Sequence, residues 1–277
     1  MTAGSVEAER NAALLGWYRA NQRVLPWRAT TDPYAVLVAE TMLQQTQAAR
    51  VVPYYQSFLA RFPDVTALAA APFAAVAAAW SGLGYNRRAR WLHRAAQRIA
   101  AAGWPDTVAG LEALPGVGGY TARAVAVFAF GHRDVTPDTN LKRVLSRWYG
   151  EPLAGSTLRR VGLAALDEDA ASWNQAVMDL GNAICRPYDP ACDRCPVERW
   201  CTGPDVYQRP ATQSPFPGSV RQVRGVIVRL LIGGPLDETA FAAATNRFPT
   251  DQVEEALDGL IEDGLVVETE DGFAIAD

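Results

Sequence analysis

The sequence predicts a mainly α-helical protein with a small winged-helix-like module at its C-terminus. Apolar residues recur at helical spacing through the first 213 residues, and strand-like alternation is absent there. Near the C-terminus, three helical patterns precede an alternating segment that is interrupted by a turn. The chain has 277 residues, and domains of about 100 to 200 residues are common. We therefore expect a helical region over 1–202, a linker over 203–218 and the module over 219–277.

The helical region contains two long apolar patterns with recognisable ends. Asp32 and Pro33 are typical of a helix start, because aspartate caps the first turn and proline suits its first position. A periodic run then extends over 34–59. A second run covers 89–102 and ends at Gly103, where glycine favours the C-terminal cap. Both segments are predicted to be helices.

The C-terminal module has a different pattern. Helices are predicted over 220–232, 237–245 and 250–263. The segment 265–276 alternates across the turn Glu270-Asp271-Gly272, which is typical of a β-hairpin. Three helices followed by a hairpin predict a winged helix.

Composition excludes several classes of protein. With 49% hydrophobic and 20% charged residues, the chain is neither disordered nor fibrous. The sequence has no uncharged apolar stretch of about 18 residues, so no membrane span is expected. The first ten residues lack the basic and apolar regions of a signal peptide. We expect a monomer in the cytoplasm, associated with the nucleoid if the source is prokaryotic.

The formal net charge of −4 hides an uneven distribution. Residues 1–213 carry a net charge of +4, whereas residues 214–277 carry −8. Arginines cluster after Tyr85, and a second basic run follows Asp138. Solvated helix faces are the ordinary explanation of such runs, and contacts to phosphate are the alternative.

All four cysteines fall within 17 residues, with the spacing C-x6-C-x2-C-x5-C. Such clustering in a chain without a secretory signal predicts one metal site rather than disulfides. The spacing alone leaves zinc and an iron–sulfur cluster open, because both accept four thiolates. The predicted ligands are Cys185, Cys192, Cys195 and Cys201.

Three other features are candidates for binding or catalysis. The segment 114–121 has the form of a helix-hairpin-helix, in which the backbone of Gly116 and Gly118 can approach a phosphate. Glu40 lies on an apolar helix face, where burial raises the pKa of a carboxyl group and suits it to act as a general acid. Asp138 begins another helical segment. Each has an ordinary alternative: a simple glycine turn, a satisfied buried glutamate and an N-cap.

Taken in order, seven motifs resemble the MutY adenine DNA glycosylases, which belong with endonuclease III to the helix-hairpin-helix superfamily. The resemblance covers about residues 14–202. The motifs are Leu25-Pro-Trp-Arg28, Ala39-Glu-Thr-Met-Leu-Gln-Gln-Thr-Gln47, Gly82-Leu-Gly-Tyr85, Leu114-Pro-Gly-Val-Gly118, Asp138-Thr-Asn140, Asn174-Gln175 and the four-cysteine loop.

The resemblance implies a two-lobed all-helical glycosylase with a 4Fe-4S cluster on the four cysteines. It also implies base excision on double-stranded DNA that contains a mismatch, with adenine opposite 8-oxoguanine or guanine as the target. Glu40 would protonate adenine, and Asp138 would stabilise the oxocarbenium-like sugar. Tyr120 and Asn140 match positions that support this intermediate.

Further residues match the family's base and DNA contacts. The base would leave the stack to be reached, with Gln45 and Tyr85 filling or prying open the vacated space. The residues expected at the substrate are Arg23, Leu25, Trp27, Arg28, Gln44, Gln45, Tyr85 and Gln175. The residues expected at DNA are Arg87, Arg88, Gly116, Gly118, Lys142 and Arg143.

The lysine content bears on the reaction type. Bifunctional relatives form a Schiff base through a lysine at the position of Tyr120, and this chain contains a single lysine, Lys142. A phenol cannot form a Schiff base. We therefore predict a monofunctional glycosylase, with Lys142 as a phosphate contact.

The C-terminal segment departs from the family pattern. Typical members continue into a larger domain that resembles NUDIX hydrolases and reads 8-oxoguanine, whereas 64 residues follow position 213 here. This leaves lesion recognition open. The acidic module is expected to pack on the catalytic part or to bind a protein partner. A related glycosylase for mismatched thymine or uracil, and a non-catalytic iron–sulfur DNA-binding protein, are the alternatives.

Overall fold

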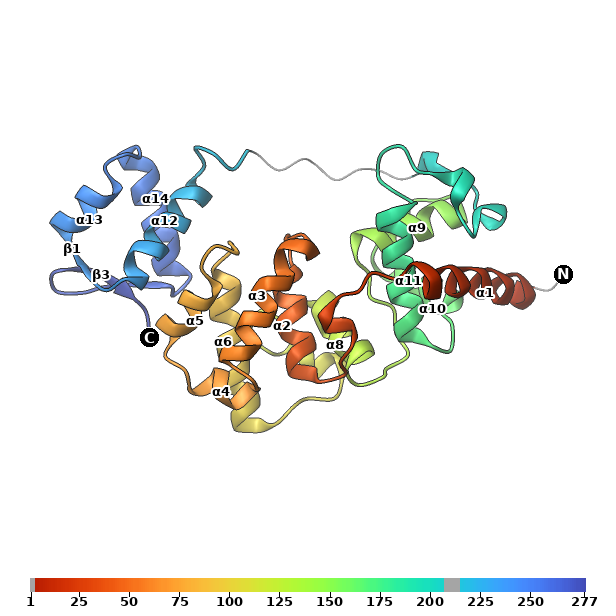
Figure 1. Ribbon diagram of the computed structural model, residues 1–277, viewed down its shortest axis with the longest axis horizontal. Helices are drawn as coiled ribbons and strands as arrows, with labels where there is room; N and C mark the ends of the chain where they lie inside the picture. The colour runs from red at the N-terminus through yellow and green to blue at the C-terminus, as the bar shows by residue number, and fades with distance from the viewer. Residues whose placement is uncertain (1–2, 207–214) are drawn as a thin grey trace. The chain divides into compact units, whose positions relative to one another are not determined.

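The computed structural model describes residues 3–206 and 215–277 (Figure 1), so residues 207–214 of the expected linker lie outside the described residues. The chain folds into two compact units, and neither is formed by one continuous segment. Within the described residues, the first unit comprises 3–36, 106–112 and 117–206, and the second comprises 37–105, 113–116 and 215–277.

The first unit is a helical bundle. Buried apolar residues from its helices form one core, which includes the fully buried Leu14, Val144 and Trp173. Its α-helices are α1 (Ala3–Asn21), α7 (Val108–Glu112), α8 (Gly119–Phe128), α9 (Thr139–Tyr149), α10 (Gly155–Ala165) and α11 (Ala170–Ala183). Short 3-10 turns are η1 (Pro26–Arg28), η2 (Cys192–Arg194), η3 (Glu198–Trp200) and η4 (Pro204–Val206).

The second unit begins within α2 and continues through four further helices before the C-terminal module. Phe58 and Trp80 pack edge to face at its centre, with ring centroids 6.0 Å apart, and both are fully buried. The helices are α2 (Pro33–Leu43), α3 (Ala48–Arg61), α4 (Val65–Ala70), α5 (Phe73–Trp80) and α6 (Arg87–Ala102).

The start of α2 agrees with the sequence prediction, but its length does not. The Asp32 carboxylate accepts hydrogen bonds from the backbone N–H groups of Tyr34 and Ala35 at 3.1 and 3.3 Å. The helix predicted over 34–59 is broken at residues 44–47, where Gln45 has a φ of 55°. The turn itself contains no glycine or proline, and apolar periodicity continues on both sides of it. The pattern therefore did not reveal the break.

The C-terminal module has the element order of a winged helix. Its helices are α12 (Val220–Ile232), α13 (Glu238–Thr245) and α14 (Thr250–Glu262), and its strands are β1 (Leu236–Asp237), β2 (Val266–Glu268) and β3 (Gly272–Ile275). The strands form an antiparallel sheet in the order β1-β3-β2. Sequence alternation predicted the hairpin, whereas the two-residue β1 is too short to give a pattern.

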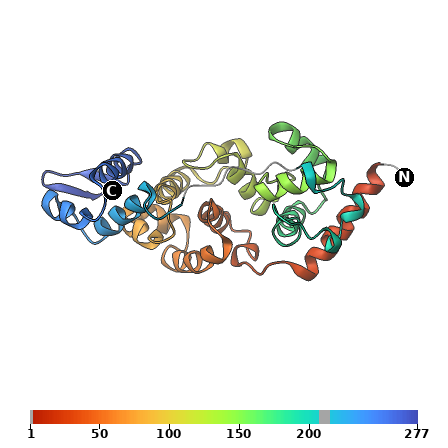
Figure 2. The same cartoon turned by 90° about the horizontal axis from the view of Figure 1, so that it is seen from above.

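Within the second unit, the module packs on α5 and α6. Helix α12 lies beside α5 (Figure 2). Asp263 forms ion pairs with Arg87 on α6, at 3.1 Å, and with Arg224 on α12. Arg90 of α6 donates to the carbonyl of Asp277 at 2.8 Å. Part of the arginine cluster after Tyr85 therefore meets the acidic module.

None of the helices described is both long enough and apolar enough to cross a membrane.

Candidate active site and cysteine loop

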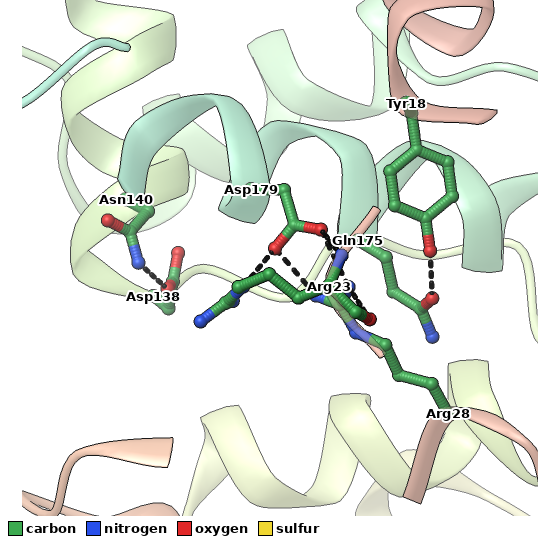
Figure 3. A network of polar contacts seen from close by, with 7 residues as sticks. All are labelled: Tyr18, Arg23, Arg28, Asp138, Asn140, Gln175 and Asp179. Atoms are coloured by element: carbon green, nitrogen blue, oxygen red, sulfur yellow. Dashed lines mark hydrogen bonds and ion pairs between the residues drawn. The ribbon is translucent and has the colours of Figure 1, made fainter. Parts of the chain in front are cut away.

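Asp138 is held at the N-terminus of α9 by both of its carboxylate oxygens (Figure 3). Oδ1 accepts from the backbone N–H of Leu141 at 2.6 Å, and Oδ2 accepts from the Asn140 side-chain amide at 2.8 Å. Burial raises the pKa of Asp138, while these hydrogen bonds and the charge of Arg143 oppose the rise. Asp138 is thus the N-cap that the sequence suggested, and the cap fixes the carboxylate in one orientation.

Arg143 supports this arrangement from within the protein. The residue is 3% exposed, and its Nη2 donates to Asn140 Oδ1 and to the Gly181 carbonyl, both at 2.7 Å. Its Nε donates to the carbonyl of Cys185 at 2.7 Å. These contacts connect the cysteine loop to Asn140 and through it to Asp138. The guanidinium of Arg143 donates to protein acceptors, and the phosphate contact expected for this residue stays a prediction.

Asn174 fixes the segment that leads to Asp138. Its Oδ1 accepts from the backbone N–H and the hydroxyl of Thr136 at 2.8 and 2.9 Å. Its Nδ2 donates to the carbonyls of Asp134 and Ala170 at 3.0 and 2.8 Å. Since Asn174 is fully buried with its amide satisfied on both sides, it holds this loop against α11.

A second polar network surrounds Asp179 on α11 (Figure 3). Asp179 Oδ1 accepts from Arg23 Nε at 2.6 Å and from Arg28 Nη2 at 2.9 Å, and Oδ2 accepts from Arg28 Nη1 at 2.7 Å. On the same helix, Gln175 Oε1 accepts from the Tyr18 hydroxyl at 2.6 Å. The structure therefore brings together three residues that the resemblance assigned to the substrate.

Asp179 and Tyr18 were missed by the sequence analysis. Asp179 lies four residues after Gln175 and so on the same face of α11, together with the polar Ser172 and Asn182. Its spacing from Gln175, a residue expected at the substrate, is the signal that could have identified it. Burial raises the pKa of Asp179, but hydrogen bonds and charge from Arg28 and Arg23 outweigh this and lower it below the usual range.

We expect Asp179→Asn to destabilise the protein by about 3 kcal/mol at neutral pH, because it leaves two arginines without their buried partner. A group with a lowered pKa stabilises the fold above its unfolded pKa of about 3.9 and loses this contribution as the pH falls through its folded value. Urea unfolding at pH 7 and at decreasing pH measures the effect, with the exposed Asp106→Asn as control. Equal stability of Asp179→Asn and wild type at pH 7 would contradict this role.

Two other residues expected at the substrate lie beside this network. Trp27, in η1, is 8% exposed, and Leu25 precedes η1 in a half-buried position. Both follow Arg23, whose backbone N–H also donates to Asp179 at 3.1 Å. Asp179 thus holds this N-terminal segment through backbone and side-chain contacts.

Glu40 belongs to the second unit. It lies on α2 and is 6% exposed, and on its side of the helix Val36 and Leu37 are buried and Leu43 is half-buried. The apolar face predicted around this carboxyl group is therefore present in the fold.

Gln45 and Tyr85 have unusual backbone conformations. Their φ angles are 55° and 50°, and in the described parts of the chain Asp189 is the other non-glycine residue with a positive φ. Tyr85 is 37% exposed, and Gln45 is also exposed, whereas Gln44 is half-buried. Left-handed backbone at a non-glycine residue costs free energy and often marks a functional site.

The residues expected at DNA are placed differently from one another. Gly116 has a φ of 72°, and a Cβ there would collide with the Trp91 side chain, so this turn requires glycine. Gly118 is exposed and forms the N-cap of α8, with Tyr120 half-buried in the first turn. Lys142 is exposed.

Arg87 and Arg88, adjacent in sequence, differ in environment. Arg87 is exposed and pairs with Asp263. Arg88 is 5% exposed and donates to backbone carbonyls, and its expected contact with DNA stays a prediction.

The four cysteines line one cavity, together with Trp148, Leu180 and Ile184. Arg147 holds this loop: its Nη1 donates to Cys185 Sγ at 3.2 Å, and its carbonyl accepts from Cys201 Sγ at 3.4 Å. Burial raises the pKa of the Cys195 thiol to about 12. A metal bound here would have to displace thiol protons.

The arrangement of the four thiols bears on which metal or metal cluster they could hold. Over residues 3–206 and 215–277, no three His, Cys, Asp or Glu side chains converge closely enough to hold one metal ion. Four thiolates are a ligand set that both zinc and an iron–sulfur cluster accept. The cavity that the four cysteines share is compatible with such a group.

Comparison with known proteins identifies relatives that cover most of the chain. The model of the HhH-GPD superfamily base excision DNA repair protein matches residues 38–156. The adenine DNA glycosylase of Mycobacterium tuberculosis strain H37Rv is 39% identical over 95% of this chain and 92% of its own length. That of Mycolicibacterium smegmatis is 38% identical over 95% and 94%. Human adenine DNA glycosylase is 39% identical, over 68% of this chain and 38% of its own.

The mycobacterial alignments correct one prediction. Because they span 95% of the chain, they include most of the C-terminal module. The resemblance therefore does not end near residue 202, as the motifs suggested.

Solved structures agree on the fold. A thermostable thymine-DNA glycosylase aligns with a TM-score of 0.69 at 26% identity, over 73% of this chain and 98% of that one. An endonuclease III–DNA covalent intermediate aligns with a TM-score of 0.62 at 20% identity, over 73% and 96%. The identity to curated relatives over nearly their full length, together with the helical fold, shows that this chain belongs to the MutY family of adenine DNA glycosylases in the HhH-GPD superfamily of base excision repair enzymes.

Proposed function

We propose that this enzyme removes adenine mispaired with 8-oxoguanine or guanine, by base flipping and hydrolysis of the N-glycosidic bond without cutting the strand. The observation that carries the proposal is the carboxylate of Asp138, fixed by the N-terminus of α9 and by Asn140. Adenine as the base follows from membership of the adenine DNA glycosylases. The identity of the base opposite the adenine is a separate part of the proposal.

Glu40 is proposed as the general acid. Adenine is a poor leaving group as an anion, so a proton delivered to its N7 lets it depart as a neutral base. Glu40 is buried on α2, and a carboxyl group is one of the side chains that act as general acids in enzymes.

Asp138 is proposed to stabilise the positive charge that develops on the sugar. Its fixed orientation means that little reorganisation accompanies the reaction. Asn140 holds Oδ2 in place, and Tyr120 is proposed to support the same intermediate. A retaining glycosidase uses its second carboxylate in a comparable way.

The adenine pocket is proposed to include the network around Asp179. Arg23 and Arg28 are oriented by its carboxylate, and Gln175 by Tyr18. Polar groups that are already held in place can select a base by its hydrogen-bonding edge.

The four cysteines are proposed to hold a 4Fe-4S cluster, and the shared cavity supports that group. The cluster, when bound, organises the loop that carries its ligands. Arg147 donates a hydrogen bond to the sulfur of Cys185 and so helps to hold this ligand in place.

DNA is proposed to contact the N-terminus of α8 through Gly116 and Gly118, and Lys142 through its amine. Backbone N–H groups at a helix start bind phosphate without regard to sequence. A partner for the acidic module and a location in the cytoplasm stay predictions.

Lys142→Ala is expected to weaken DNA binding on every sequence and to reduce the slope of log K against log salt by about 0.9, the value of one released counterion. Fluorescence anisotropy over a salt series measures this. Arg160→Ala, which removes an equal charge from an exposed position on α10, is the control. An unchanged slope in Lys142→Ala would mean that this amine does not touch phosphate.

The proposed function is tested by release of labelled base from four duplexes, with A opposite 8-oxoguanine, A opposite G, T opposite G and U opposite G. Adenine release from the first two is expected. Faster release of thymine or uracil would overturn the proposal in favour of a different mismatch glycosylase. No release from any duplex would favour a non-catalytic DNA-binding protein.

The same reactions test the monofunctional mechanism. Tyr120 has no amine to form a Schiff base, so borohydride should trap little enzyme on DNA. Efficient trapping would contradict a purely hydrolytic reaction.

A further inference from the structure

Arg88 is a buried cation whose hydrogen bonds join two separate turns of the second unit. At the first turn, its Nη1 donates to the carbonyls of Thr41, Met42 and Gln44 at 2.9, 2.8 and 2.6 Å. Its Nη2 donates to Thr46 Oγ1 at 3.2 Å. These acceptors lie on both sides of the end of α2.

The contacts at this turn cap α2. Thr41 and Met42 belong to its last turn, where carbonyls have no partner within the helix and carry the negative end of its dipole. An arginine is well suited to bind several such carbonyls. Because Glu40 lies on the same last turn, Arg88 also fixes the end of the helix that carries the proposed general acid.

At the second turn, Arg88 contacts the segment that carries Tyr85. Its Nη2 donates to the Gly84 carbonyl at 3.0 Å, and its Nε donates to the Tyr85 carbonyl at 3.4 Å. The guanidinium carbon lies 5.4 Å from the Trp80 ring centroid and 5.2 Å from that of Tyr85. Trp80 Nε1 also donates to the Gly84 carbonyl, at 3.1 Å.

Each turn contains one non-glycine residue in a left-handed conformation, Gln45 in the first and Tyr85 in the second. Both conformations are unfavourable for residues with a Cβ, and neighbouring contacts must offset their cost. Arg88 bonds the carbonyl just before Gln45 and those of Gly84 and Tyr85. The side chains of both left-handed residues are exposed.

We propose that Arg88 is a positioning residue that holds the Gln45 and Tyr85 turns in their left-handed conformations, so that both side chains are ready to enter the base stack. The inference rests on the proposed base-flipping function and extends it to a residue whose side chain is bonded within the protein. Burial lowers the pKa of Arg88 to about 10, which leaves it protonated at neutral pH.

Lysine cannot replace Arg88 in this role. An ammonium group has three donors at one point, whereas the guanidinium presents five in a plane and reaches acceptors on both turns. Arg88→Lys therefore keeps the charge but cannot bond both turns at once. Arg94→Lys makes the same change at an exposed position of α6 and is the matched control.

The test measures flipping separately from chemistry. In a Glu40→Gln background, 2-aminopurine replaces the target adenine in a duplex, and its fluorescence rises when the base leaves the stack. We expect Arg88→Lys to reduce this rise strongly while changing duplex affinity by less than about threefold, because the phosphate contacts remain. With Glu40 intact, adenine excision in single turnovers should fall by about 100-fold, as for other small misplacements.

Two further sets of variants separate the possible failures. Tyr85→Ala and Gln45→Ala, measured in the same assay, test flipping by these side chains. Unchanged fluorescence in both variants would overturn the proposed role of these two side chains in base flipping. If they reduce the signal but Arg88→Lys does not, the positioning role is wrong. If Arg88→Lys fails to fold, Thr46→Val takes its place in the test, because it removes one acceptor and leaves Arg88 unchanged. This variant should also reduce flipping, and a normal signal from it would overturn the proposal.

Discussion

Glu40→Gln and Asp138→Asn are each expected to lower the single-turnover rate of adenine excision by about 1000-fold or more, within the range that general acids and fixed charges contribute. Both replacements preserve shape. Asparagine at position 138 can still cap α9 by accepting from Leu141. Affinity for the duplex should change little, because neither carboxyl group is proposed to bind phosphate.

Excision of radiolabelled adenine and anisotropy on the same duplex measure these two effects. Glu112→Gln, at the exposed last residue of α7, is the control for loss of one carboxylate. Turnover by either active-site variant at the wild-type rate would eliminate the proposed mechanism.

The pH dependence of excision follows from the environment of Asp138. The carboxylate must be ionised to stabilise a cation, and burial raises its pKa above the usual value. Activity should therefore fall as the pH drops through this raised pKa, so the acid limb lies above that of a free aspartate. Asn140→Ala removes a hydrogen bond that favours the ionised form and should move this limb to still higher pH.

The second large effect is expected from Cys195→Ser. Cys195 lines the cavity shared by the four cysteines, and serine is a poor ligand for iron in such a cluster. The variant should lose the brown colour that iron–sulfur clusters give, which corresponds to absorbance at about 400 nm. It should also melt at a lower temperature, because the loop then lacks the bonds that tie its ends together.

Asp193→Asn, at an exposed position between two of the cysteines, is the matched control and should retain the colour. Iron and sulfide analysis of the purified proteins completes the comparison. Full iron content in Cys195→Ser would show that this thiol is not a ligand, and zinc in the wild type would show that the site holds a different metal.

Features that depend on neighbours along the chain could be predicted from the sequence. Asp32 caps α2 as expected, Asp138 caps α9, and Glu40 lies on a buried face. The limits of α12 also agree with the pattern. In each case, residues within four positions supply the interaction, so local periodicity and capping rules contain the information.

Features that depend on distant partners could not be predicted in this way. Arg88 and Arg143 look like surface cations in the sequence, yet each is buried through bonds to carbonyls about 40 positions away. Backbone carbonyls leave no trace in composition or charge pattern. Asp179 was missed for a related reason, because its partners Arg23 and Arg28 are more than 150 positions distant.

The two interleaved units have a consequence for how the chain folds during synthesis. Helix α1 emerges first but packs on α11, and α5 and α6 meet the C-terminal module only when translation is nearly complete. Neither unit can reach its final contacts while the other half of the chain is missing, so folding domain by domain from the N-terminus is excluded. Truncation before α12 would therefore leave arginines of α6 and an apolar face of α5 uncovered in the nascent protein, a condition that favours aggregation.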